Sequence, residues 1–118
     1  MANTSVFRVI GPTTAIGVSS TSSTAVTITP TGNDQINYCG FLNTNSFPVS
    51  VNIAPSSAGA ATLPSSGTTT SVVLGVAMSS PMVLAVPAGG SGQGFSVTAI
   101  TTGTNTGTIY VTPMADQS

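Results

Sequence analysis

Only three of the 118 side chains in this sequence carry a formal charge at neutral pH, which limits what the chain can fold into. Arg8 is the cation, Asp34 and Asp116 are the anions, and Lys, Glu and His are absent. A typical soluble domain is about 25 % charged, whereas this chain is 3 % charged. Glu and Lys are strong helix formers, and Val, Ile and Thr suit a pleated strand. The composition therefore predicts an all-β protein.

An uncharged chain rich in Ser, Thr and Gly is either disordered or folded with a surface of hydroxyls, amides and backbone. Disordered chains combine low hydrophobicity with high net charge. Here 40 % of residues are hydrophobic, the mean hydropathy is +0.42 and the net charge is −1. The chain is therefore expected to fold. Because a net charge near zero promotes association, we expect it to function as a structural part of a larger assembly.

Short strand-like runs alternate with turn-forming residues along the whole chain. In the clearest run, Val49, Val51 and Ile53 are predicted to face inward, and Ser50 and Asn52 outward. The segment 69–78 is apolar enough to predict a strand that is buried on both faces. The predicted strands span residues 5–10, 24–29, 35–42, 49–53, 69–78, 82–86, 95–101 and 108–112.

Two stretches of the sequence follow the same plan. Residues 29–55 and 86–113 each run from a Pro-x-Gly turn through an apolar strand, a polar turn and a β-branched strand to a second proline. We interpret them as two similar β-hairpins, as a double Greek key supplies. The predicted fold is one antiparallel β-sandwich of about eight strands over residues 1–118, jelly-roll or Greek-key in topology. Residues 114–118 are expected to form a short polar tail.

The residue inventory argues against an enzyme. General acid–base catalysis needs a titratable pair, and only Asp34 and Asp116 are available; no base is present to activate a serine. No catalytic, cofactor-binding or metal-ligating residues are therefore assigned. A calcium site at Asn33 and Asp34 is the weaker alternative to a solvated turn. The glycine-rich segment 89–94 is interpreted as a turn, and Cys39 as a small buried hydrophobe.

Several kinds of partner are also excluded by composition. Nucleic acids and anionic membrane surfaces are recognised by clustered Lys and Arg, and this chain has one Arg. No apolar run approaches the roughly 20 residues that a membrane-spanning helix needs. The first residues lack the basic and apolar regions of a signal peptide, so none is expected in this form of the chain.

Three phrases resemble small structural proteins of tailed bacteriophages. They are FLNTNSFPVSV at 41–51, VPAGG at 86–90 and GTIYVTP at 107–113, within a resemblance that covers about residues 36–113. Such proteins include capsid decoration or cement proteins, several of which are β-sandwiches or jelly rolls. The resemblance implies a non-enzymatic protein made in the host cytoplasm that binds and stabilises the outer capsid surface. Its expected partners are the major capsid protein and other copies of itself, with a dimer favoured over a trimer.

Two other functions remain open at this stage. One is a carbohydrate- or receptor-binding head module of a phage fibre, which would need aromatic platforms. The other is a fibre- or pilus-type subunit that assembles by strand exchange. Residues 1–10 are a candidate contact strand, because a terminal strand can sit at a sheet edge and pair with another chain. Its expected partner-contact residues are Val6, Phe7, Arg8, Val9 and Ile10.

Overall fold

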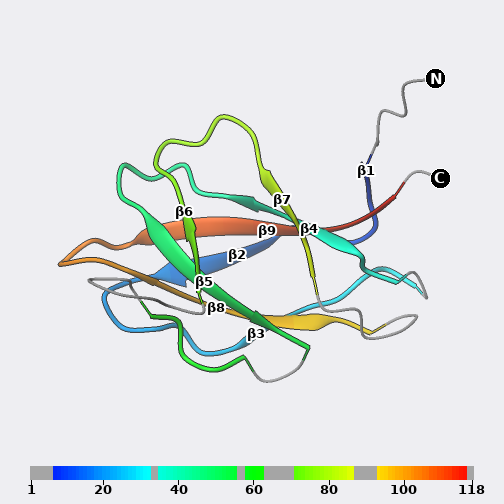
Figure 1. Cartoon of the computed structure of the whole chain (residues 1–118), viewed down its shortest axis with the longest axis horizontal. Coiled ribbons are helices and arrows are strands. Elements are labelled where there is room, and N and C mark those ends of the chain that lie inside the picture. The colour runs from blue at the N-terminus through cyan, green and yellow to red at the C-terminus, as the bar shows by residue number, and fades with distance from the viewer. Residues whose placement is uncertain (1–6, 33–34, 56–57, 63–70, 87–92, 117–118) are drawn as a thin grey trace.

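The computed structural model describes residues 7–32, 35–55, 58–62, 71–86 and 93–116, which form two antiparallel sheets packed face to face with no helix among them (Figure 1). The predicted all-β sandwich is therefore confirmed. The strands are β1 (Phe7–Val9), β2 (Thr14–Val18), β3 (Val26–Ile28), β4 (Tyr38–Leu42), β5 (Val49–Ala54), β6 (Val72–Leu74), β7 (Met82–Ala85), β8 (Phe95–Thr101) and β9 (Gly107–Asp116).

The order of the strands is that of a jelly roll. Sheet A runs β2–β9–β4–β7, with β1 also paired to β9, and sheet B runs β3–β8–β5–β6. Since β1 and β2 lie along the same long strand, they form one interrupted first strand. In chain order the eight resulting strands lie in sheets A, B, A, B, B, A, B and A, which is the order that two Greek keys produce. The jelly-roll prediction is thus confirmed.

The interruption between β1 and β2 is a close approach of backbone that only glycine permits. A Cβ atom on Gly11 would lie 2.7 Å from the Thr29 carbonyl oxygen and 2.9 Å from Pro113 Cγ. The pairing register with β9 changes across it, from Arg8↔Ala115 in β1 to Ile16↔Ile109 in β2. The sequence analysis did not predict β2.

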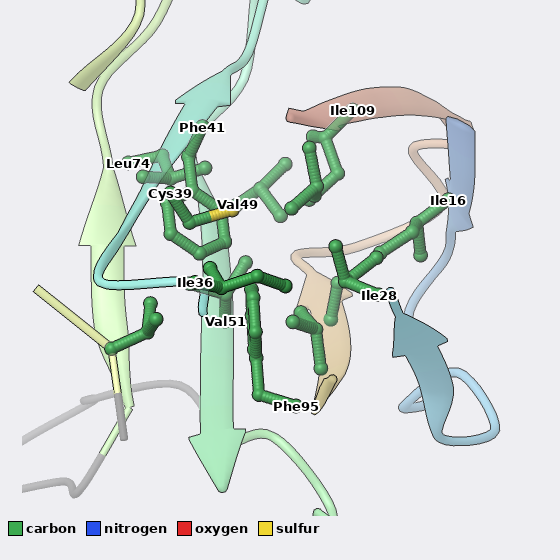
Figure 2. Packing of buried hydrophobic residues seen from close by; sticks show 14 of the residues in the cluster. Ile16, Ile28, Ile36, Cys39, Phe41, Val49, Val51, Leu74, Phe95 and Ile109 are labelled. Atoms are coloured by element: carbon green, nitrogen blue, oxygen red, sulfur yellow. The ribbon is translucent and has the colours of Figure 1, made fainter. Parts of the chain in front are cut away.

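The core lies between the sheets and is filled mainly by aliphatic side chains, with two phenylalanines as the largest members. Phe41 from sheet A and Phe95 from sheet B are 0 % and 1 % exposed. Ile16 and Ile109 of sheet A face Ile28 of sheet B in the same cluster (Figure 2). The inward prediction for Val49 and Val51 is confirmed, since both are fully buried, and Ile53 packs against the cluster.

The two stretches with a common plan are not hairpins, contrary to our interpretation. β4 and β5 follow one another in the chain but belong to different sheets, and so do β8 and β9. Each pair therefore arches over the core. The two arches are neighbours, because β4 pairs with β9 and β5 pairs with β8. They supply the two central strands of each sheet.

Two strand predictions need correction. β9 does not end at residue 112 but continues to Asp116, so residues 114–116 are strand and not part of a polar tail. This extension is held on both sides, since Met114 pairs with Val9 and with Tyr38. In the 69–78 segment only β6 is strand among the described residues. Its Val73 is 43 % exposed, so the strand is not buried on both faces.

Candidate interaction surfaces

The predicted contact strand lies at an edge of sheet A, although Val6 is outside the described residues. β1 pairs with the end of β9. Arg8 and Val9 are exposed, whereas Ile10 is buried and donates its backbone N–H to the Pro113 carbonyl at 3.1 Å. Ile10 is therefore a core residue and not a contact residue. Contact of β1 with a partner stays a prediction.

Along residues 108–114 of β9 and the strands paired with them, the outer face of sheet A carries mostly apolar side chains and no charged one. Side chains alternate between the two faces along a strand, and residues paired on neighbouring strands point to the same face. Every second set of paired residues across β2, β9, β4 and β7 therefore forms a row on the outer face. One row contains Ala15, Tyr110 and Leu42, and a second contains Thr112, Gly40 and Val83. The third row contains Val9, Met114, Tyr38 and Ala85.

Side chains on this face remain accessible in the described part of the chain. Tyr110 is 40 % exposed and Val9 is 61 % exposed. Gly40 is buried because the side chain of Met114 lies over it; a Cβ there would meet Met114 Cε at 2.8 Å. The methionine thus fills the dip that the glycine leaves in the sheet. Accessible apolar side chains that lie next to one another in this way can mark an interaction site.

The outer face of sheet B is more polar along β8 and β5, and part of it is covered by its own chain, whereas Val73 on β6 is 43 % exposed there. Residues 58–62 cross it after β5. Ser96 Oγ accepts the Ala58 N–H at 3.0 Å, and Thr98 Oγ1 donates to the Gly59 carbonyl at 2.6 Å. Both side chains are 2 % exposed. The chain therefore covers the polar side chains of β8 on sheet B and leaves apolar side chains on the outer face of sheet A accessible.

This cover also corrects the outward prediction for β5. Ser50 and Asn52 do point away from the core, but Ser50 is buried and Asn52 is only partly exposed. Ser50 is 0 % exposed, and its hydroxyl has no hydrogen-bond partner among the described residues. Asn52 Nδ2 donates to the Gly59 carbonyl at 3.0 Å.

A buried asparagine amide organises one end of the sandwich. Asn43 is 0 % exposed, and its Nδ2 donates to the carbonyls of Phe47 and Gly75, both at 2.9 Å. Its Oδ1 accepts from the backbone N–H and the side-chain amide of Asn45, at 3.1 and 2.8 Å. Asn45 in turn donates to the Thr108 carbonyl at 2.9 Å. These bonds join the β4–β5 connection to the segment after β6 and to β9.

The same network binds the backbone next to an exposed apolar residue, Val76. The Ala77 N–H donates to the Asn45 carbonyl at 2.8 Å, and Ala77 has a φ of 47°, which is uncommon for a residue other than glycine. Val76, just before it, is 52 % exposed. Sequence reasoning treated residues 43–46 as a polar turn. The two asparagines at 43 and 45 were the sequence feature that could have indicated this amide network.

The candidate metal-binding and glycine-rich segments form no site among the described residues. No group of three or more His, Cys, Asp or Glu that could hold a metal occurs among the described residues. Asn33 and Asp34 of the calcium alternative lie outside those residues, as does most of the glycine-rich segment 89–94. The described residues also contain no helix long and apolar enough to span a membrane.

Cys39 is a core residue, as the sequence predicts. It is 0 % exposed, and burial raises the pKa of its thiol from 9.0 to about 12, an effect that a hydrogen bond with the Thr112 backbone partly offsets. The thiolate is the reactive form of cysteine. We therefore expect the native protein to resist thiol reagents at pH 8. Stoichiometric labelling without unfolding would contradict this.

The same pKa predicts a loss of stability in alkali. Below pH 9 the thiol is protonated in both states, so its contribution is complete. Between pH 9 and 12 only the unfolded state loses the proton, and stability falls by about 1.4 kcal/mol per pH unit. From pH 8 to 10.5 the free energy of unfolding, measured in urea, should fall by about 2 kcal/mol more in the parent than in Cys39→Ala. Equal slopes would contradict the assignment.

Comparisons of the sequence with protein-family models and with curated proteins, and of the fold with solved structures, found no match.

Proposed function

We propose that this protein is a non-enzymatic component of a phage virion that binds the outer surface of the capsid lattice and stabilises it. The observation that carries the proposal is the contrast between the two sheets. A self-sufficient soluble domain would cover its apolar sheet face and expose its polar one, because burial of apolar area is favourable. Here Ser96 and Thr98 of sheet B are covered while Tyr110 and Val9 of sheet A are exposed, which fits a protein whose outer face of sheet A is covered by a partner.

The nature of the contact follows from the chemistry of that face. The rows of paired residues around Tyr110 include no charged side chain. Binding then comes from apolar burial and from backbone and hydroxyl hydrogen bonds. A complementary surface on the major capsid protein would be equally uncharged. Since a lattice presents many identical sites, a linked pair of copies gains retention through multivalency.

The carbohydrate-binding alternative is less well supported by the positions of the aromatic residues. Sugar platforms need exposed rings. Phe41 and Phe95 are fully enclosed in the core, and Phe47 and Tyr38 are only partly exposed. Tyr110 is 40 % exposed, and the side chain of Phe7 lies outside the described residues. The aromatic side chains that the structure describes therefore offer a sugar one well-exposed ring.

The proposal is tested by isolating intact particles and measuring the copy number of this protein on them. We expect it to co-purify at a copy number that matches a symmetry-related set of lattice sites. Raising the salt concentration from dilute to molar should release almost none of it, because screening acts on charges and this chain has three. Absence from particles would refute the function, and release by salt would refute the apolar mechanism.

A further inference from the structure

We propose that β2 is an interface between two copies of this chain, which pair edge to edge as antiparallel strands about a two-fold axis at Ile16. The inference rests on the proposed function in one respect, which is that a dimer would be retained more strongly on a lattice than a single chain. The interface itself is argued from the strand. Two-fold dimers are the commonest protein oligomers, and their interface uses the same patch twice.

The first argument is that β2 is the edge strand without protection against such pairing. Proteins protect edges by making them very short or by placing charges or prolines there. β3 and β6 have three residues each, β1 has three and includes Arg8, and β7 has four and follows Pro81. β2 has five residues, Thr-Ala-Ile-Gly-Val, with neither a charge nor a proline among them, and Pro12 stands two residues before the strand. Among the described residues it pairs only with β9.

The second argument is that the strand fits a copy of itself. In an antiparallel pair centred on Ile16, Ala15 of one copy lies opposite Gly17 of the other, and Thr14 lies opposite Val18. Ala15 and Gly17 are small and exposed, and a Cβ on Gly17 would meet nothing within 4 Å. The β2 strand of a second copy could therefore lie at the usual spacing of about 4.8 Å. On the outer face, Ala15 and Gly17 would not have to move to make room for it.

Electrostatics does not oppose a second copy in this register. With the axis at Ile16, the two Arg8 side chains lie on opposite sides of the axis and far from each other, so no like charges meet. The pairing would join two four-stranded layers, each β2–β9–β4–β7, into one sheet. The apolar outer faces of both copies would then be continuous. A dimer would thus offer a lattice twice the surface that one chain offers.

The experiment uses charge to test both the interface and its register. In the double variant Ala15→Lys/Gly17→Lys, each lysine faces a lysine across the axis, and like charges directly opposite one another destabilise a strand pair. In Ala15→Lys/Gly17→Glu, each lysine faces a glutamate. Thr27→Lys/Ala85→Lys is the control, with the same added charge at exposed positions on other edge strands. Sedimentation gives the mass of each.

We expect the parent, the control and the Lys/Glu variant to have twice the chain mass of 11.5 kDa. The Lys/Lys variant should sediment as the single chain, with an unchanged β-type circular dichroism spectrum. If the Lys/Lys variant is unfolded, Ala15→Glu/Gly17→Glu, which again places like charges opposite one another across the axis, replaces it. A monomeric parent, a dimeric Lys/Lys variant or a monomeric Lys/Glu variant would each overturn the proposal. These results concern the mass of the free protein, and the copy number of the parent protein on particles tests the proposed function separately.

Discussion

Replacement of Asn43 by aspartate should lower the free energy of unfolding by about 4 kcal/mol, since each buried group left unsatisfied costs about 1–3 kcal/mol. The aspartate keeps an oxygen that accepts from Asn45. It has no N–H to donate to the carbonyls of Phe47 and Gly75, which now receive bonds at 2.9 Å. A negative charge would instead face two carbonyl oxygens in a site that is 0 % exposed. Such a loss is a large part of the 5–15 kcal/mol that holds a typical domain folded.

The matched control for this substitution is Asn37→Asp. It adds the same charge at an exposed position just before β4, the strand that Asn43 follows. Surface substitutions usually change stability by less than about 0.5 kcal/mol. Urea unfolding of both variants, monitored by circular dichroism, gives the comparison. If Asn43→Asp loses no more stability than Asn37→Asp, the amide network does not stabilise this end of the sandwich.

The sequence predicts individual strands well where alternation is regular. β8 was predicted over residues 95–101 and has those bounds, because Phe95, Val97 and Ala99 alternate with residues of the opposite face. β2 was missed, because only Ile16 and Val18 mark its inner face and small residues separate them. Its pairing with β9 is a tertiary contact that short-range patterns do not encode.

The arrangement of strands and the functional surfaces were harder to predict. A strand, a polar turn and a second strand have the same pattern in a hairpin and in an arch between sheets. The turn that begins at Asn43 looks solvated, yet its amide is buried by contacts with Gly75 and Asn45, the first of them 32 residues away. The contrast between the outer faces has the same origin. Ser96 and Thr98 alternate like solvent-facing residues, but residues 58–62 cover them.

Tyr110→Lys should release the protein from its particle while leaving the isolated chain folded. Tyr110 is 40 % exposed on the outer face of sheet A, so a lysine there is solvated in the free protein. In the proposed complex the same ammonium would be buried against an uncharged surface without a partner. An unpaired buried charge weakens binding by roughly 3 kcal/mol, which is about 150-fold for each contact. The copy number on purified particles measures the effect.

Val73→Lys is the control for this substitution. Val73 is 43 % exposed on β6, so it matches Tyr110 in exposure, in its position on a strand and in the charge that a lysine adds, but it belongs to sheet B. We expect Val73→Lys to occupy particles at the parental copy number. Both variants should sediment like the parent, because neither residue lies on β2. Equal retention of the two variants would show that the capsid contact lies elsewhere than the outer face of sheet A, since only Tyr110→Lys places a charge there.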